Sequence, residues 1–143
     1  KFSSAPACLA LRANIPAAKR RPALVAALQA AGHELVPVCP EVYGGLPTPR
    51  TPAERIGSRV VTAAGADVTA QYRKGAEIAL QLARLTLPGA VLKANSPSCG
   101  HGTIYDGTFS GKKIPGSGVA AELLEQNGIA VYTDEDCAAA LPF

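Results

Sequence analysis

Short apolar segments alternate with longer amphipathic segments along this chain, and glycine and proline separate the two kinds. Apolar residues with helical spacing predict helices over residues 22–31, 68–86 and 118–126. Apolar segments typical of strands cover residues 2–7, 33–38, 59–62, 90–94 and 129–132. Strands that alternate with helices form a mostly parallel sheet, because each crossover must return the chain to the same end of the sheet.

The expected fold class is therefore α/β, with a three-layer, Rossmann-like, mostly parallel sheet that carries helices on both faces. The chain has 143 residues, which suits one core, and neither a linker nor an internal repeat divides it. We expect a single domain over residues 1–143. Residues 40–57 and 100–116 are predicted as loops rich in proline and glycine. The expected helix N-caps are Asp67, Ser117 and Thr133.

Composition excludes several classes of protein. Hydrophobic residues make up 48% and charged residues 17%, which is typical of a globular chain. A net charge of +3 and an aromatic content of 5%, without tryptophan, make nucleic acid an unexpected partner. The longest apolar run falls short of the roughly 20 residues that a membrane-spanning helix needs. With no secretion signal, we expect a cytoplasmic protein with reduced thiols.

Three of the four cysteines occupy equivalent places in the predicted topology. Cys8, Cys39 and Cys99 each lie at or just beyond the carboxyl end of a predicted strand, and these ends meet at one edge of a parallel sheet. Three thiolates suit a soft metal, as either a catalytic zinc or an iron–sulfur cubane with one open iron. The same spacing is equally consistent with small buried side chains. Cys137 falls instead in a predicted alanine-rich final helix.

Polar residues flank two of these cysteines. Glu41 follows Cys39 with one proline between them, which makes it a candidate acid or base, although a solvated loop residue fits the same pattern. Ser96 and Ser98 precede Cys99, and their hydroxyl groups are candidates for binding a substrate or cluster sulfurs. A serine before proline is also a common way to open a turn.

The glycine-rich segment 100–118 follows Cys99 and matches neither the P-loop nor the dinucleotide-binding fingerprint. Its exposed backbone N–H groups are suited to holding an anion. Tyr105, Asp106 and Lys112 are candidate residues of a substrate pocket. An ordered surface loop is the alternative interpretation, and it is the expected one for His101.

Several motifs of the chain resemble those of a known family. They include Cys39-Pro-Glu41, Ser96-Pro-Ser-Cys-Gly100 and the stretch from Gly102 to Lys112. Together they closely resemble the thiouracil desulfurase (TudS-type) family, over nearly the whole chain from about residue 34 to residue 136. The resemblance implies a 4Fe–4S cluster held by Cys8, Cys39 and Cys99, with the sulfur of a thiolated pyrimidine on the fourth iron.

The resemblance also implies roles for the polar residues. Glu41 is expected in proton transfer or water activation, with assistance from Ser96 and with Ser98 as a further candidate. The expected reaction replaces the sulfur of thiouracil or a related base or nucleoside by oxygen and releases sulfide, with no net redox change. The chain departs from the family pattern at Pro6, where a serine is usual, and over residues 15–18, which lack the usual arginine, tyrosine and aspartate. The natural substrate can therefore differ from free thiouracil.

Two other functions fit the same residues. One is a non-catalytic module in which zinc or a cluster is structural and the glycine-rich loop captures an anion. This alternative predicts a fourth protein ligand such as His101, because a structural zinc site is closed. The other is a redox sensor built on a cluster or on reactive thiols.

Overall fold

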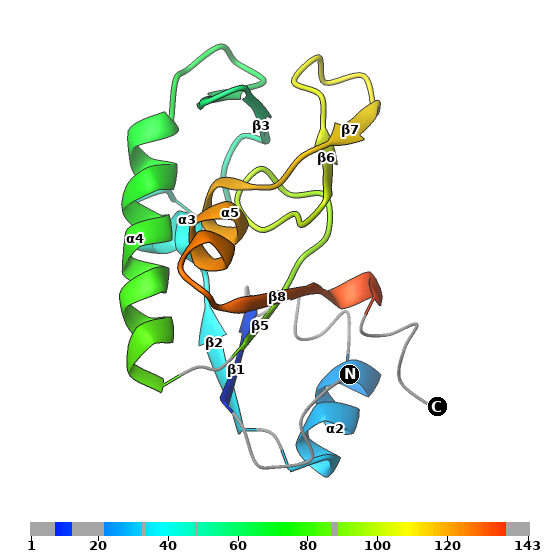
Figure 1. Cartoon of the computed structure of the whole chain (residues 1–143). Helices are drawn as coiled ribbons and strands as arrows, with labels where there is room; N and C mark the ends of the chain where they lie inside the picture. Colours follow the sequence, from blue (N-terminus) through cyan, green and yellow to red (C-terminus); the bar gives the residue numbers. More distant parts are fainter. Residues whose placement is uncertain (1–7, 13–21, 33, 48, 87–88, 137–143) are drawn as a thin grey trace.

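A four-stranded parallel sheet forms the centre of the fold. The computed structural model describes residues 8–12, 22–32, 34–47, 49–86 and 89–136 (Figure 1). The strands are β1 (Cys8–Arg12), β2 (Glu34–Val38), β5 (Gly89–Leu92) and β8 (Ala130–Thr133). Their order in the sheet is β2-β1-β5-β8, and each neighbouring pair is parallel. The predicted parallel sheet is thus confirmed.

Helices cover both faces of this sheet (Figure 1). Helix α2 (Pro22–Ala30) packs on one face against Val91, whereas α4 (Thr69–Thr86) and α5 (Val119–Gln126) pack on the other against Leu92. Successive residues of a strand point to opposite faces, so Val91 and Leu92 belong to two separate apolar clusters. The three-layer arrangement follows from this alternation.

Two segments predicted as loops contain regular structure. Residues 40–57 include the short helix α3 (Pro40–Tyr43) and strand β3 (Ala53–Ile56), which pairs antiparallel with β4 (Arg59–Thr62). Pro40 opens α3, because proline is well tolerated in the first turn of a helix. Gly57, with a φ of 59°, forms the tight turn between β3 and β4. Residues 100–116 contain a second hairpin, formed by β6 (Thr103–Tyr105) and β7 (Lys113–Pro115).

Two of the predicted N-caps are confirmed and one is wrong. The Asp67 carboxylate accepts a hydrogen bond from the Thr69 backbone N–H at 2.9 Å, and the Thr133 hydroxyl accepts one from the Asp136 N–H at 3.0 Å. Helix α5 begins after Gly118, and the Ser117 hydroxyl instead accepts a hydrogen bond from the Gly102 N–H. The strand predicted over residues 2–7 and the final helix around Cys137 lie outside the described residues.

Helix α4 is the longest of the described helices, and its outer face carries charged residues. With 18 residues it includes exposed Arg73, Lys74, Glu77 and Arg84. Across the described part of the chain, none of the helices combines the length and the apolar character needed to cross a membrane.

Helix α3 packs against α4 through backbone atoms. A Cβ atom on Gly75 of α4 would lie only 1.7 Å from the carbonyl oxygen of Pro40, and a Cβ on Gly44 would lie 1.9 Å from that of Gln71. Neither position can therefore carry a side chain unless the two helices separate. Because α3 begins directly after Cys39, this contact determines where Cys39 and Glu41 lie.

We predict that Gly75→Ala destabilises the protein by about 1–3 kcal/mol, because the added methyl group forces α3 away from α4. In an ordinary helix the same substitution stabilises by roughly 0.5–1 kcal/mol. Urea unfolding followed by circular dichroism measures the difference, with the exposed Lys74→Ala variant as a control expected to stay within about 0.5 kcal/mol. A Gly75→Ala protein as stable as the wild type would contradict the backbone contact.

Candidate active site

The first part of the candidate site follows strand β2. Cys39 comes directly after Val38, the last residue of β2, and is the N-cap residue of α3. The Cys39 side chain is buried, and so is the carboxylate of Glu41 in the first turn of the helix. Cys39 and Glu41 therefore both lie at the carboxyl edge of the sheet, as the sequence predicted.

Glu41 is held by an ion pair that we did not predict from the sequence. Arg50 Nη2 donates a hydrogen bond to Glu41 Oε2 at 2.9 Å, and Arg50 Nη1 donates to the carbonyl oxygen of Pro47. Both side chains of the pair are largely buried, with 5% of Glu41 and 15% of Arg50 exposed. A buried charge needs a partner, so Arg50 both stabilises and orients the carboxylate. The alternative of a solvated loop glutamate is wrong for this residue.

The second part of the site is the turn of residues 96–100, which follows strand β5. The Ser96 hydroxyl accepts hydrogen bonds from the backbone N–H groups of Ser98 and Cys99, at 3.1 and 3.0 Å. Cys99 is fully buried, and its Sγ lies 3.8 Å from the equally buried Ser98 Oγ. Ser96 thus has the turn-forming role that its sequence context allowed, and it orients the backbone that carries Cys99.

Helix α5 packs its N-terminus against this turn. The N–H of Val119 donates to the carbonyl oxygen of Pro97 at 2.8 Å, and the N–H of Ala120 donates to that of Ser98 at 2.9 Å. Gly118 makes this approach possible, because a Cβ there would lie 2.3 Å from the carbonyl carbon of Ser98. The positive end of the α5 dipole therefore lies beside the turn that carries Cys99, where it favours negative charge.

The backbone position of Cys8 differs from the prediction. Strand β1 begins at Cys8 and ends at Arg12, whereas the sequence suggested a strand that ends at Cys8. Cys8 is in register with Glu34, the first residue of β2, and Arg12 is in register with Val38, the last. Cys8 therefore begins β1 instead of ending a strand, and its part in a cluster stays a prediction.

The donor set at this edge fits a three-cysteine cluster only in part. Cys39 and Cys99 follow β2 and β5, the two strands that flank β1, and both are buried. Within the described ranges, no group of three His, Cys, Asp or Glu residues is arranged to hold a metal ion. Two of the three expected ligands, Cys39 and Cys99, therefore follow strands that end at this edge, and the part of Cys8 stays a prediction.

The candidate pocket residues Tyr105, Asp106 and Lys112 lie on the β6–β7 hairpin and contact other residues of the same hairpin. The ammonium group of Lys113 lies 5.8 Å from the centre of the Tyr105 ring, and the backbone N–H of Asp106 donates to the carbonyl oxygen of Lys112. Hydrogen bonds from the Thr108 hydroxyl and backbone N–H hold the pKa of Asp106 below its ordinary value, with help from the nearby charge of Lys112. Their role in a substrate pocket stays a prediction.

His101 lies near the start of the same segment. Its Nε2 is 2.6 Å from Oε2 of Glu125 on helix α5, and both side chains are partly exposed. This pairing at the surface agrees with the expectation that His101 belongs to an ordered surface loop.

Glu54 is a further buried residue that the sequence analysis did not single out. Its Oε1 accepts hydrogen bonds from the backbone N–H groups of Gly107 and Phe109, at 2.9 and 3.1 Å. Glu54 lies on β3, so its carboxylate ties the tip of the β6–β7 hairpin to the β3–β4 hairpin. The partners are 53 and 55 residues apart in the sequence, and no local motif reveals such a contact.

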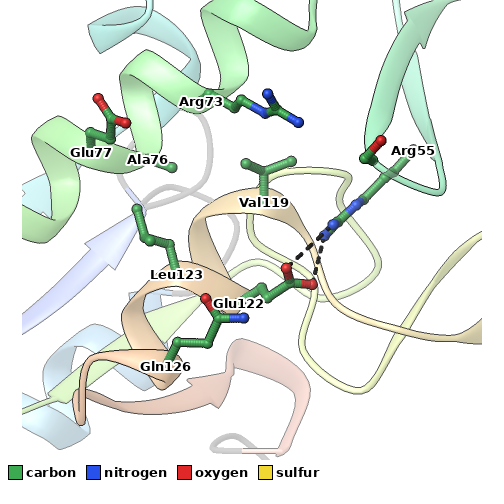
Figure 2. Close-up of a pocket in the computed structure, with 9 residues that line it drawn as sticks. Arg55, Arg73, Ala76, Glu77, Val119, Glu122, Leu123 and Gln126 are labelled. Carbon is green, nitrogen blue, oxygen red and sulfur yellow. Dashed lines mark hydrogen bonds and ion pairs between the residues drawn. The ribbon is translucent and has the colours of Figure 1, made fainter.

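A cavity of about 290 Å³ lies between α4, α5 and the β3–β4 hairpin (Figure 2). Arg55 spans its edge, donating to both carboxylate oxygens of Glu122 and to the carbonyl oxygen of Ser117. The cavity is lined by Arg55, Ser58, Arg73, Ala76, Glu77, Val119, Glu122, Leu123 and Gln126. None of the predicted site residues is among them.

We predict that Arg50→Met lowers the free energy of unfolding by about 3–5 kcal/mol, because it removes the cation that faces the buried Glu41 carboxylate. The double variant Arg50→Met/Glu41→Gln should be less destabilised, since it buries no charge at this position. Urea unfolding measures both. The exposed pair Arg59–Asp67 supplies the control, because Arg59→Met should cost less than about 1 kcal/mol. Equal losses in Arg50→Met and Arg59→Met would contradict this role.

Comparison with known proteins agrees with the resemblance found in the motifs. The chain is 49% identical over 112 residues to the protein YbbK of Bacillus subtilis (strain 168), a match that covers 71% of this chain and 74% of YbbK. It is also similar to a solved structure of TudS, a 4Fe-4S-dependent thiouracil desulfidase, with a TM-score of 0.73 and 48% identity. That match covers 81% of this chain and 79% of the other. The model of the 2-thiouracil desulfurase family matches residues 7–136, and the chain therefore belongs to this family of enzymes.

Proposed function

We propose that this protein is an iron–sulfur-dependent desulfurase that removes sulfur from a thiolated pyrimidine base or nucleoside. The observation that carries the proposal is a buried thiol and a buried carboxylate after β2, with a second buried thiol after β5, a strand that ends at the same edge of the sheet. Membership of the 2-thiouracil desulfurase family and the similarity to TudS support the same reaction. The site draws on residues from β2 to the loop after β5, which supports treating residues 1–143 as one iron–sulfur-binding domain.

The reaction replaces a C=S bond by a C=O bond. One water molecule supplies the oxygen, sulfur leaves as sulfide with the two protons of that water, and no electrons enter or leave. Cys39 and Cys99 at the carboxyl edge are proposed as ligands of an iron–sulfur centre, together with Cys8 as the third ligand that the family resemblance implies. Such a centre, when it has an open iron, supplies a soft Lewis acid for a thiocarbonyl sulfur.

Glu41 is the proposed base. Its carboxylate is oriented by Arg50 through a 2.9 Å hydrogen bond, which provides a fixed acceptor for a proton of the attacking water. Among the carboxylates of the candidate residues, Glu41 is the one that adjoins a site thiol in the sequence and is buried with it. A buried, preoriented carboxylate loses little freedom in the transition state, which is what efficient proton transfer requires.

Ser96 and Ser98 are proposed to orient the substrate ring. The Ser96 oxygen already accepts two backbone N–H groups, so its own O–H is the part of the group that is suited to donate. The two accepted hydrogen bonds polarise the hydroxyl group, so a hydrogen bond that its O–H donates becomes stronger. Tyr105, Asp106 and Lys112 on the hairpin are proposed as outer residues of the substrate pocket.

The alternative of a closed structural zinc site receives no support from His101. That alternative needs a fourth protein ligand, and His101 is paired with Glu125 at the surface. The proposal of an enzyme therefore takes precedence over a purely structural metal site.

The test of the proposed function is anaerobic reconstitution with iron and sulfide, followed directly by 2-thiouracil or 4-thiouracil and a sulfide assay. We expect bound iron and inorganic sulfide, a broad sulfur-to-iron charge-transfer absorbance band, and conversion of thiouracil to uracil with one sulfide released per thiouracil. Loaded protein that releases no sulfide from either thiouracil or from a thiolated nucleoside would contradict the proposal.

We predict that Glu41→Gln retains the bound iron but lowers turnover by about 10²-fold or more, the scale of a lost acid–base group. The substitution keeps the size of the side chain and its hydrogen bond from Arg50, so the fold should survive. Iron content and sulfide release are measured on the same sample, with exposed Glu77→Gln as the matched control. Unchanged turnover in Glu41→Gln would remove this residue from the mechanism.

A further inference from the structure

We infer that the cavity between α4, α5 and the β3–β4 hairpin is a second binding site, and that its ligand is a small organic oxyanion with an apolar ring (Figure 2). None of the residues proposed for the desulfuration reaction lines this cavity, so the inference does not depend on the proposed function. Its basis is an arginine without a partner above an apolar floor, beside a second arginine that is fixed in place.

The fixed side of the cavity is Arg55. Its Nε donates to the carbonyl oxygen of Gly57 at 2.8 Å, and its Nη1 donates to that of Ser117 at 2.6 Å. Nη1 and Nη2 also donate to the two carboxylate oxygens of Glu122, at 3.1 and 3.4 Å. Only 14% of the Arg55 side chain is exposed, and these hydrogen bonds engage four of the five N–H groups of a guanidinium. Arg55 therefore forms a rigid wall and neutralises Glu122.

The charge that is available to a ligand belongs to Arg73. This residue is exposed on the outer face of α4, and it has neither an ion pair nor a hydrogen bond within the part of the chain that the structure describes. Figure 2 shows its guanidinium extending over Val119 toward the side of the cavity where Arg55 lies. A planar guanidinium binds a carboxylate or a phosphate through two parallel hydrogen bonds. An oxyanion above Val119 would supply the partner that Arg73 lacks.

The floor of the cavity is apolar. Ala76 of α4 is buried, and Val119 and Leu123 of α5 are half-buried beside it. An inorganic anion would leave this apolar surface in contact with water, whereas a ring attached to the anion would cover it. The volume of about 290 Å³ is close to the lower end of the roughly 300–1,000 Å³ that small-molecule sites occupy. These features together fit one ring that carries one carboxylate or phosphate group.

The two acidic residues of the lining do not favour a cation instead. Both carboxylate oxygens of Glu122 accept hydrogen bonds from Arg55. Glu77 is exposed, and Figure 2 shows its carboxylate directed away from Val119 and Arg55. The unneutralised charge that reaches over the apolar floor is therefore the positive charge of Arg73.

The experiment compares full-length wild type, Arg73→Gln and the matched control Lys74→Gln. Lys74 is the next residue of α4, is equally exposed and loses the same charge, but it does not line the cavity. The probes are benzoate and phenyl phosphate, with neutral benzamide and cationic benzylamine as ligands of similar size. Isothermal titration calorimetry measures each Kd, and methyl NMR signals of Val119 and Leu123 locate the bound ring. Circular dichroism checks that both variants are folded.

We expect the Kd of the tighter-binding oxyanion to be at least tenfold lower than that of benzamide or benzylamine, with saturable shifts of the Val119 and Leu123 methyl signals. Arg73→Gln should raise this Kd at least tenfold, because a charge-assisted hydrogen bond is lost, whereas Lys74→Gln should stay within twofold of the wild type. Four results overturn the inference: oxyanions that bind no more tightly than benzamide, tighter binding of benzylamine, equal Kd values in Arg73→Gln and the wild type, or methyl signals that do not shift. Sulfide release is not among these readouts, so failure of the proposed reaction leaves this inference standing.

Discussion

Close backbone contacts that only glycine permits hold both cysteine segments in place. Gly75 brings α4 against the carbonyl group of Pro40, and Gly118 brings the start of α5 against the turn that carries Ser98 and Cys99. Side chains can change rotamer, but a contact between two backbones yields only if a whole element moves. This rigidity suits the proposed metal site, whose thiols come from different segments and must be held in place within a fraction of an ångström.

Hydrogen bonding inside the site combines structural and chemical roles in the same groups. The Ser96 oxygen fixes the turn and its O–H is the donor proposed for the substrate, while Arg50 neutralises and orients Glu41. A buried polar group is stable only when it is paired, so the pairing that keeps the fold intact also sets the direction of each functional group. Substitutions here are therefore expected to change stability and chemistry together, which is why paired controls are needed.

Local signals in the sequence predicted the sheet and most of its helices, because apolar periodicity and the positions of Pro and Gly act over a few residues. The Glu41–Arg50 pair and the carboxylate of Glu54 depend on how distant segments meet, and no local pattern reports that. Strand β1 was not predicted at Cys8–Arg12, because this segment is short and only partly apolar, and it carries no strong alternating pattern.

Burial and pairing support the proposal of Glu41, rather than the hairpin residue Asp106, for proton transfer. Thr108 hydrogen bonds lower the pKa of Asp106, so this exposed carboxylate is ionised at neutral pH and its stabilising effect is lost only as the pH falls through that lowered value. Asp106 Oδ1 accepts both hydrogen bonds from Thr108, so this oxygen holds the turn of the hairpin. The Glu41 carboxylate, by contrast, is buried in the first turn of α3 directly after Cys39 and is oriented by Arg50, which supports it as the proposed acceptor of a proton from the attacking water.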